Sequence, residues 1–282
     1  MASIKTIKQY LSKFTLLKVL YIIYSTLKQQ YGLSLNWLGG LFDIILFSNE
    51  YRVFQANNDN KNFELKIKDW IPCLTDKTEF TPVEPVYFLQ DTWAASKIFQ
   101  LKPEHHHDVG SSVKTIGIIS QFVPVTMIDI RPIDIELKNL YFQEGSVLDL
   151  PFEDNSIESL SSLCVIEHIG LGRYGDPLDP WGSEKAVKEL KRVVKLGGII
   201  LFSVPVDEKN KIYFNGCRAF TRDYVLQLFD GFELVEEKYQ YGRQLYDSYD
   251  PSKKFGTGLY MFKKEKYIQD DRKYDKISTT KT

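Results

Sequence analysis

The sequence predicts an α/β fold with a mainly parallel sheet that ends in an antiparallel pair of strands, preceded by a helical extension. After residue 104, short apolar runs alternate with amphipathic segments, which is the pattern of βαβ units. The last two strand-like runs, at 232–241 and 257–265, are joined by a polar segment that does not read as a helix. Parallel neighbours need a long crossover, usually a helix, so this pair is expected to be antiparallel.

Composition limits the classes of function. The chain has 282 residues and a formal net charge of −1, which argues against nucleic acid as its main partner because phosphate binding needs a clustered basic surface. The three cysteines are far apart and form no C-x-x-C pair. They predict neither a disulfide framework nor a zinc site, and favour a reducing compartment such as the cytoplasm. No segment reaches ~18 consecutive apolar residues, so no membrane-spanning helix is expected.

Residues 1–60 are predicted to form the helical N-terminal extension. Within residues 1–31, apolar residues recur at helical spacing, several lysines accompany them, and no acidic residue occurs before Asp43. Two interpretations stay open. The helix either packs on the main domain or a partner, or it lies on an anionic membrane surface as a peripheral contact. The polar run that begins at Gln55 is expected to be a linker.

Residues 61–103 are predicted to be a loop followed by one helix. Prolines at 72, 82 and 85 favour a loop, and the segment Tyr87–Phe99 has the apolar spacing of a helix that ends before Pro103.

Residues 104–264 are predicted to form the α/β domain. Strands are expected within 105–110, 124–130, 141–150, 156–166, 198–206, 232–241 and 257–265, and helices within 111–122, 183–195 and 221–229. Ser183 and Thr221 are predicted N-caps, and Gly197–Gly198 is predicted to stop the helix that begins at Ser183. The charged tail, residues 265–282, is expected to be solvated and partly disordered.

Ligands of an open α/β sheet bind beyond the carboxyl ends of its strands. This rule brings together five stretches: "DVGSS" from Asp108, "DIRP" from Asp129, "LDLPF" from Leu148, "EHIGLGRYGDPLDP" from Glu167 and "PVDEKNKIYFNGCR" from Pro205. The charged loop after Glu167 is therefore predicted to form the rim of a pocket.

The first two stretches suit a nucleoside with an anionic tail. Gly110 lets the backbone approach a ligand, and a helix that starts near Ser111 offers free N–H groups to a carboxylate. Asp129, at the end of the second strand, can accept hydrogen bonds from both hydroxyls of a ribose. After the third strand, Asp149 can accept from an exocyclic amine and Leu150 can pack against a flat base.

The order "DVGSS…MIDIRP…GSVLDLPFEDNSIESL…CVIEHI…KELKRVVKLGGIILFSVP…GFELVEE" resembles class I S-adenosylmethionine-dependent methyltransferases over roughly residues 104–264. More narrowly, "LPFEDNSIESLSSLCVIEHIGLGRYGDPLDPWG" with "FNGCRAF" is similar to a family of uncharacterised proteins, a domain of unknown function within that superfamily. The resemblance implies a Rossmann-like sheet of seven strands, the last inserted antiparallel, and S-adenosylmethionine as cofactor. The implied cofactor-binding residues are Asp108, Gly110, Ser111, Asp129, Ile130, Asp149 and Leu150.

Within this resemblance Gly110 lies under the methionine part of the cofactor, Asp129 holds the ribose, and Asp149 holds the adenine amino group. The helix Tyr87–Phe99 is implied to cover the cofactor. The sequence departs from the family pattern in two places. The usual G-x-G-x-G keeps only Gly110, and the first strand reads "HHHD" where a central strand is normally apolar.

The expected activity is methyl transfer to a polar small molecule or a saccharide. His168 is the candidate general base, with an alternative in which it orients its loop. The candidate substrate-binding residues are Arg173, Tyr174, Asp176, Asn215 and Arg218, although Arg173 and Asp176 could instead pair to close the loop and Asn215 and Arg218 could serve the following turn. No metal is expected at His105–His107, because neighbouring side chains of a strand point to opposite faces.

Two other functions are weighed. A methyltransferase-like protein that binds a ligand or partner without catalysis would explain the missing glycines. A nicotinamide-dependent oxidoreductase would require G-x-G-x-x-G after the first strand, where this sequence reads "GSSVKT" from Gly110.

Overall fold

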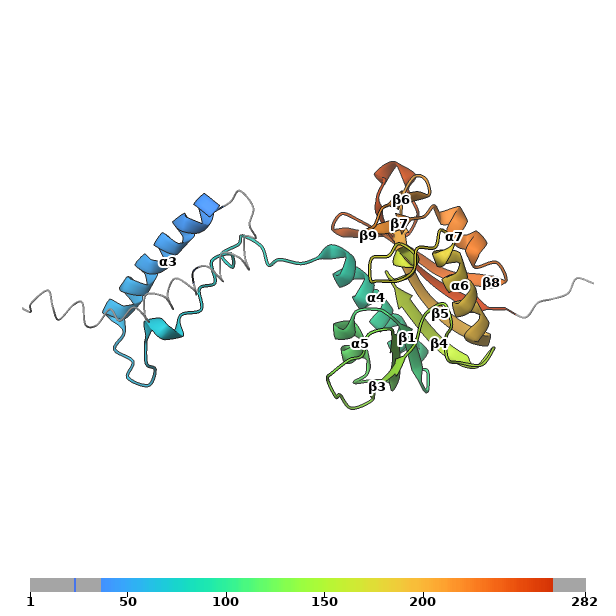
Figure 1. The fold of residues 1–282 in the computed structure, drawn as a ribbon, viewed down its shortest axis with the longest axis horizontal. Coiled ribbons are helices and arrows are strands. Elements are labelled where there is room, and N and C mark those ends of the chain that lie inside the picture. The colour runs from blue at the N-terminus through green and yellow to red at the C-terminus, as the bar shows by residue number, and fades with distance from the viewer. Residues whose placement is uncertain (1–22, 24–36, 266–282) are drawn as a thin grey trace, which may run out of the picture. The chain divides into compact units, whose positions relative to one another are not determined.

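The computed structural model of the protein describes Ile23 and residues 37–265. The rest of the predicted helix at 1–31, its proposed membrane contact, and the tail beyond Glu265 lie outside the described residues. The chain divides into two compact units, Met1–Pro82 and Val83–Thr282. Figure 1 shows both units as ribbons.

In the first unit, helix α3 spans Trp37–Asn57 and a 3₁₀ turn, η1, spans Ile67–Asp69. The indole of Trp70 packs edge-on against Phe47 at 5.1 Å and against Tyr51 at 4.8 Å, which fixes the segment after η1 to the helix. The helix continues past Gln55, so the first residues of the expected linker are helical. Among the described residues, no helix is both long and apolar enough to span a bilayer.

The second unit holds a sheet with the order β3-β2-β1-β4-β5-β10-β8-β9. Its strands are β1 (His106–Val109), β2 (Val125–Asp129), β3 (Leu140–Glu144), β4 (Ile157–Leu163), β5 (Val194–Val206), β8 (Phe232–Tyr241), β9 (Gln244–Tyr246) and β10 (Gly256–Lys264). The strands from β3 to β5 pair in parallel, and β10 lies antiparallel between β5 and β8. The predicted mainly parallel sheet with an antiparallel last strand is confirmed. The short edge strand β9 adds an eighth member.

Helices cover both faces of this sheet (Figure 1). They are α4 (Pro85–Leu101), α5 (Val113–Ile119), α6 (Gly182–Val193) and α7 (Arg222–Leu228), with 3₁₀ turns η2 (Ile166–His168) and η3 (Pro251–Lys253). Strand side chains alternate between the two faces. On β5, Phe202 joins the core under α6 and α7, whereas Leu201 joins the core under α4 and α5. A hairpin of β6 (Lys211–Tyr213) and β7 (Cys217–Ala219) follows β5 and was not predicted from the sequence.

Two predicted helix signals were wrong. Ser183 is not an N-cap: α6 begins one residue earlier, and the Ser183 hydroxyl is buried inside it, where it donates to the carbonyl of Ile166 at 2.7 Å. The helix ends at Val193 and β5 begins at the next residue, so Gly197–Gly198 lies within the strand, near an irregularity in the pairing of β4 with β5. The N-cap at Thr221 is confirmed, because its hydroxyl accepts from the N–H of Tyr224.

The polar first strand is accommodated by partners on its neighbour. His106 is fully buried at the centre of the sheet. Its Nδ1 lies 2.8 Å from the hydroxyl of Ser159 and its Nε2 lies 2.9 Å from that of Ser161, both on β4. His105 points elsewhere and bonds to Thr126 on β2. A buried imidazole with both nitrogens partnered avoids the desolvation cost of an orphaned polar group.

The His106 environment predicts acid sensitivity. Burial, helped by the neighbouring histidines, lowers its pKa from 6.5 to about 3. Because the folded pKa lies below the unfolded one, protonation favours the unfolded chain, and stability falls as pH drops below about 6.5. We expect this group to remove about 2 kcal/mol between pH 6.5 and 5. Urea unfolding at several pH values should show this slope of unfolding free energy against pH in the wild type and a smaller slope in His106→Gln. Equal slopes in both proteins would contradict the account.

Candidate active site

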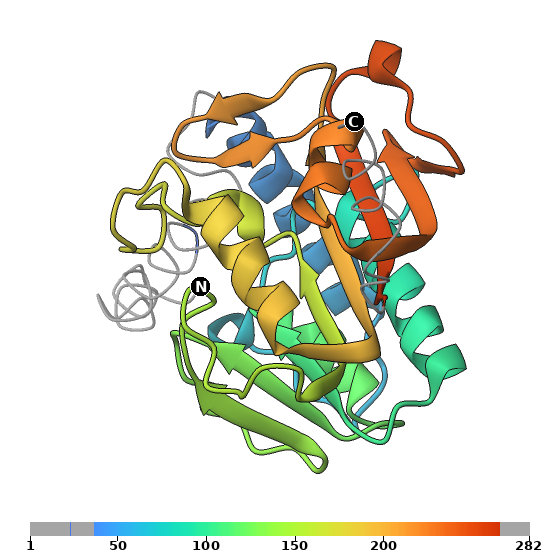
Figure 2. The same cartoon turned by 90° about the vertical axis from the view of Figure 1, so that its right-hand side faces the viewer.

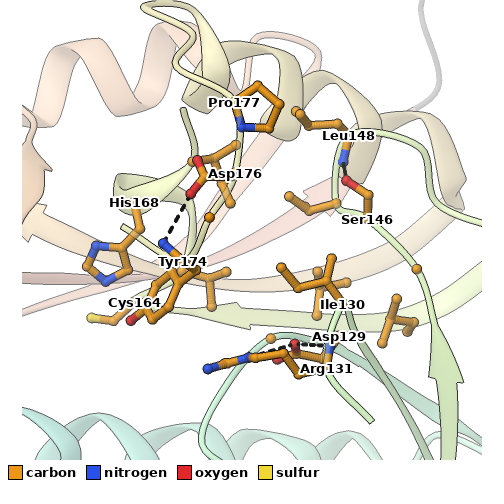
Figure 3. Close-up of a pocket in the computed structure, with 18 residues that line it drawn as sticks. Asp129, Ile130, Arg131, Ser146, Leu148, Cys164, His168, Tyr174, Asp176 and Pro177 are labelled. Atoms are coloured by element: carbon orange, nitrogen blue, oxygen red, sulfur yellow. Dashed lines mark hydrogen bonds and ion pairs between the residues drawn. The ribbon is translucent and has the colours of Figure 1, made fainter. Parts of the chain in front are cut away.

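A cavity of about 360 Å³ opens at the carboxyl ends of β1, β2 and β4 and at the turn after β3 (Figure 3). The strand order reverses at β1, which is the place where open α/β sheets bind ligands. Of the residues predicted from the sequence, Gly110, Asp129, Ile130, His168, Tyr174 and Asp176 line the cavity. The described residues that line it do not include Asp108, Ser111, Asp149, Leu150, Arg173, Asn215 or Arg218.

The turn after β1 depends on Gly110. Its φ is +70°, a left-handed conformation that favours glycine, and a Cβ at this position would lie 3.0 Å from the side chain of Val165. The turn is held from beneath by Asp108, whose carboxylate accepts from the N–H of Ser111 at 3.0 Å and from its hydroxyl at 2.6 Å. Asp108 and Ser111 therefore shape the turn that faces the ligand.

The Asp108 carboxylate is fully buried, and burial raises its pKa to about 6 despite the hydrogen bonds from Ser111 and Ser161. The Ser111 hydroxyl also accepts from the N–H of Leu163 on β4 at 3.0 Å. The first turn of the cavity is thus tied to two neighbouring strands.

Asp129 ends β2 and lines the same cavity. Its Oδ1 accepts from the backbone N–H of Arg131 at 2.8 Å, and the Arg131 Nε lies 3.3 Å away (Figure 3). A carboxylate fixed by the backbone at a strand end is suited to accept hydrogen bonds from paired hydroxyl groups.

After β3, a tight turn brings Gly145 and Ser146–Leu148 to the cavity. The N–H of Asp149 donates to the carbonyl of Ser146 at 3.0 Å, and the N–H of Leu148 lies 3.2 Å from the Ser146 hydroxyl. The turn leaves Asp149 exposed and places Leu150, which is 2% exposed, in the hydrophobic core. Sequence reasoning placed the stretch from Leu148 at the pocket but missed Ser146 and Val147, although a serine, whose hydroxyl can bond to the backbone two residues on, is a turn signal that could have indicated them.

Two polar residues shape the loop between η2 and α6. Asp176 accepts from the N–H groups of Gly170 at 2.6 Å and Tyr174 at 3.3 Å. Arg218, which is 6% exposed, donates from Nη1 to the carbonyl of Ile169 at 2.6 Å and from Nη2 to that of Asp179 at 3.0 Å. Both side chains are engaged in holding the loop.

Tyr174 projects from this loop into the cavity (Figure 3). Guanidinium groups lie near its ring, Arg131 at 5.0 Å and Arg173 at 5.2 Å from the centroid, which are cation–π distances. Arg173 also donates to the carbonyl of Gly216 at 2.9 Å. Gly216 follows the exposed Asn215 at the tip of the β6–β7 hairpin, drawn in orange in Figure 2. The hairpin and the loop are therefore tied together at the edge of the site.

His168 contacts the same hairpin. Its Nδ1 lies 2.7 Å from the carbonyl oxygen of Gly216, which can only accept, so Nδ1 carries the proton and Nε2 has the lone pair. Nε2 is 3.6 Å from Oε1 of Glu167. Burial, followed by the charge of Arg173, lowers the pKa of His168. The imidazole is therefore neutral at neutral pH, with its tautomer set by a backbone carbonyl.

Helix α4, whose central residues were predicted to cover a cofactor, is anchored beside the cavity. The Oε1 of Gln90 accepts from the Cys164 thiol at 2.9 Å and from the Ser203 hydroxyl at 2.6 Å. The helix is thereby bonded to the ends of β4 and β5. Cys164 lines the cavity. Among the described residues, none of those that line it belongs to α4.

Comparisons with known proteins agree with the narrow resemblance. Residues 151–253 match the model of a family described as "Caenorhabditis protein of unknown function, DUF268". No curated protein matches the chain.

Three solved structures illustrate the structural matches. The 1,6-didemethyltoxoflavin-N1-methyltransferase of Burkholderia thailandensis, solved with S-adenosylhomocysteine, is 14% identical with a TM-score of 0.46, over 67% of this chain and 94% of that one. The YcgJ protein of Bacillus subtilis is 14% identical with a TM-score of 0.44, over 62% and 99%. The [4+2]-cyclase SpnF is 15% identical with a TM-score of 0.44, over 61% and 82%.

The buried position of Arg218 predicts a structural effect on substitution. Arg218→Ala leaves the carbonyl of Ile169 without its Arg218 donor and removes one of the two donors to that of Asp179, and we expect it to lower the free energy of unfolding by about 2–4 kcal/mol. Arg173→Ala, at an exposed position of the loop that Arg218 holds, should cost less than about 1 kcal/mol. Urea denaturation of both variants checks this. A loss at Arg218 no greater than that at Arg173 would mean that Arg218 is free for another role.

Proposed function

We propose that this chain is an S-adenosylmethionine-dependent methyltransferase whose cofactor occupies the cavity described above. One observation carries the proposal. The left-handed turn at Gly110, the carboxylate of Asp129 and the turn at Ser146–Leu148 come from three successive strands and face a single cavity where the strand order reverses. This arrangement suits a nucleoside with a polar tail.

The residues present fit such a cofactor. The cavity volume of about 360 Å³ falls in the range of small-molecule sites. Ile130 and Leu148, which are 47% and 40% exposed, offer apolar surface to the base. Asp129 would accept hydrogen bonds from the ribose hydroxyls, the backbone around Ser146 would meet the polar edge of the base, and the turn at Gly110 would lie under the amino-acid part. When bound, S-adenosylmethionine supplies a methyl group activated on a sulfonium.

The chain's own contribution is orientation, exclusion of water and proton transfer. Correct alignment of two reacting groups can be worth about 7–11 kcal/mol. His168 lines the cavity as a neutral imidazole, and we propose that it serves as the general base through Nε2.

For the acceptor we propose a polar small molecule or a saccharide. The Tyr174 ring, half-exposed at the cavity, offers a flat platform, and Arg173 and Asn215 provide exposed polar groups nearby. Asp176 and Arg218 would act on the acceptor indirectly, by holding the loop that carries Tyr174.

Asp129→Ala tests the cofactor site. Loss of a carboxylate that accepts from ribose hydroxyls should weaken binding of S-adenosylhomocysteine at least about tenfold. Calorimetric titration measures this affinity, and a thermal shift with NAD serves as the specificity check. Asp149→Ala is the matched control, because it removes an exposed carboxylate just past the same cavity, and its affinity should equal that of the wild type.

Either of two results with the wild-type protein would contradict the proposal. Stabilisation by NAD alone would favour an oxidoreductase. No binding of either nucleotide would favour a protein without catalysis. An effect of Asp149→Ala equal to that of Asp129→Ala would move the base-binding site to Asp149.

The assigned tautomer of His168 can be observed directly. Long-range ¹H–¹⁵N spectra, with the signal assigned by its loss in His168→Gln, should show a neutral ring protonated on Nδ1 at pH 6.5. Because burial and Arg173 lower its pKa, the ring should protonate only below that pH. Protonation on Nε2 at neutral pH, or titration above pH 6.5, would exclude the proposed base.

A further inference from the structure

On the basis of that function, we propose that Glu167 is a charge-responsive acid beside the cofactor cavity. It releases its proton when a sulfonium binds and accepts a proton as the methyl group leaves.

Glu167 lies in η2, between Cys164 and Val165 on one side and His168 on the other, all three of which line the cavity. Its side chain is only 2% exposed. Within the described chain, its Oε2 is buried without a hydrogen-bond partner, and its Oε1 lies 3.6 Å from Nε2 of His168. Burying a carboxyl oxygen without a hydrogen-bond partner costs free energy, and burying it as a charged carboxylate costs more.

The groups that face Glu167 are almost all neutral. Tyr87 of α4, Cys164 at the end of β4 and Cys217 of β7 each have a pKa raised by burial and then by nearby groups that include Glu167. His168 is neutral, because burial and Arg173 lower its pKa. Arg173 is the one cation that acts on Glu167 among the described residues, and it does not offset burial.

Burial raises the pKa of Glu167 to about 8, although hydrogen bonds and Arg173 act in the opposite direction. At neutral pH the carboxyl therefore holds its proton. This makes the contact with His168 a pair of neutral groups rather than an ion pair. A cation placed in the adjoining cavity would favour the carboxylate and lower that pKa. A sulfonium is such a cation, whereas the thioether left after transfer is not.

Charge is balanced through the proposed reaction. The acceptor heteroatom forms a bond to the methyl carbon, and the electron pair of the broken carbon–sulfur bond stays on sulfur. The acceptor gives up its proton, and Glu167 changes from carboxylate to carboxylic acid. His168 Nε2, adjacent to Oε1, is placed to pass that proton. The sulfonium charge and the carboxylate charge thus disappear together, and Glu167 becomes more basic as the transfer proceeds.

Titration calorimetry tests this without turnover. S-Adenosylmethionine and S-adenosylhomocysteine are titrated at pH 7 in two buffers that differ in ionisation enthalpy, which gives the protons released on binding. We expect release of close to one proton with S-adenosylmethionine and much less with S-adenosylhomocysteine. The affinity for S-adenosylmethionine should also rise with pH below about 8, by up to about tenfold per unit.

Glu167→Gln should abolish the proton release and leave the affinity for S-adenosylhomocysteine unchanged. The affinity for S-adenosylmethionine relative to S-adenosylhomocysteine should fall about tenfold. Glu184→Gln is the matched control, because Glu184 also has a buried oxygen without a partner in the described chain but lies on α6, bonded to Tyr224. It should keep the wild-type release.

The outcomes separate the two proposals. If both ligands bind and release equal numbers of protons, or if Glu167→Gln keeps the release, the role of Glu167 is overturned and the cofactor site stands. If neither ligand binds, the proposed function fails, and this inference fails with it. Because proton release with the two ligands is compared on the wild-type protein, this test of Glu167 holds even where a variant does not fold.

Discussion

The site depends on one buried network that holds the end of the central strand. Asp108 accepts hydrogen bonds from the backbone and hydroxyl of Ser111 and from the hydroxyl of Ser161, while Ser111 accepts from Leu163. His106, two residues earlier, bonds to Ser159 and Ser161. A central parallel strand is usually apolar, whereas here His106 and Asp108 have hydroxyl partners on β4, and the buried Nδ1 of His107 has no hydrogen-bond partner among the described residues. The network fixes the direction in which the chain turns at Gly110.

From that fixed turn the remaining geometry follows. Because β2 and β4 flank β1, the chain leaves the central strand between two others whose carboxyl ends lie at the same edge. Asp129 and the loop after β4 therefore face the same cavity. Much of the polar chemistry nearby serves as scaffold. Asp176 and Arg218 shape the loop through backbone contacts, and the loop in turn presents Tyr174. The candidate site thus consists of a few side chains that face the cavity, on loops held in place by backbone hydrogen bonds.

Apart from the β6–β7 hairpin and β9, the sequence allowed the order of strands and helices to be predicted, with the antiparallel last strand and Asp129 at a strand end. These features depend on local periodicity and on a general property of α/β sheets. It did not allow the direction of individual side chains after a turn to be predicted. Asp149 and Leu150 were expected to face a base, but the Ser146–Asp149 turn rotates them to solvent and core. Such rotation depends on backbone angles that residue types only weakly specify.

Tertiary contacts explain the other differences. Ser183 has the residue type of an N-cap, but the carbonyl of Ile166 engages its hydroxyl inside the helix. Arg218 resembles a substrate ligand in sequence, yet it is surrounded by carbonyl groups from a loop more than thirty residues earlier in the chain. Glu167 stands in sequence as the first residue of a charged loop, whereas its burial, which gives the carboxyl group its unusual chemistry, depends on tertiary packing.

A crystal structure of the protein grown with S-adenosylhomocysteine tests the central claim most directly. The account predicts that the nucleoside lies in the cavity, with both ribose hydroxyls bonded to the Asp129 carboxylate and the adenine ring between Ile130 and Leu148. A nucleoside bound at another surface, or crystals grown at saturating ligand in which the cavity is empty, would contradict it.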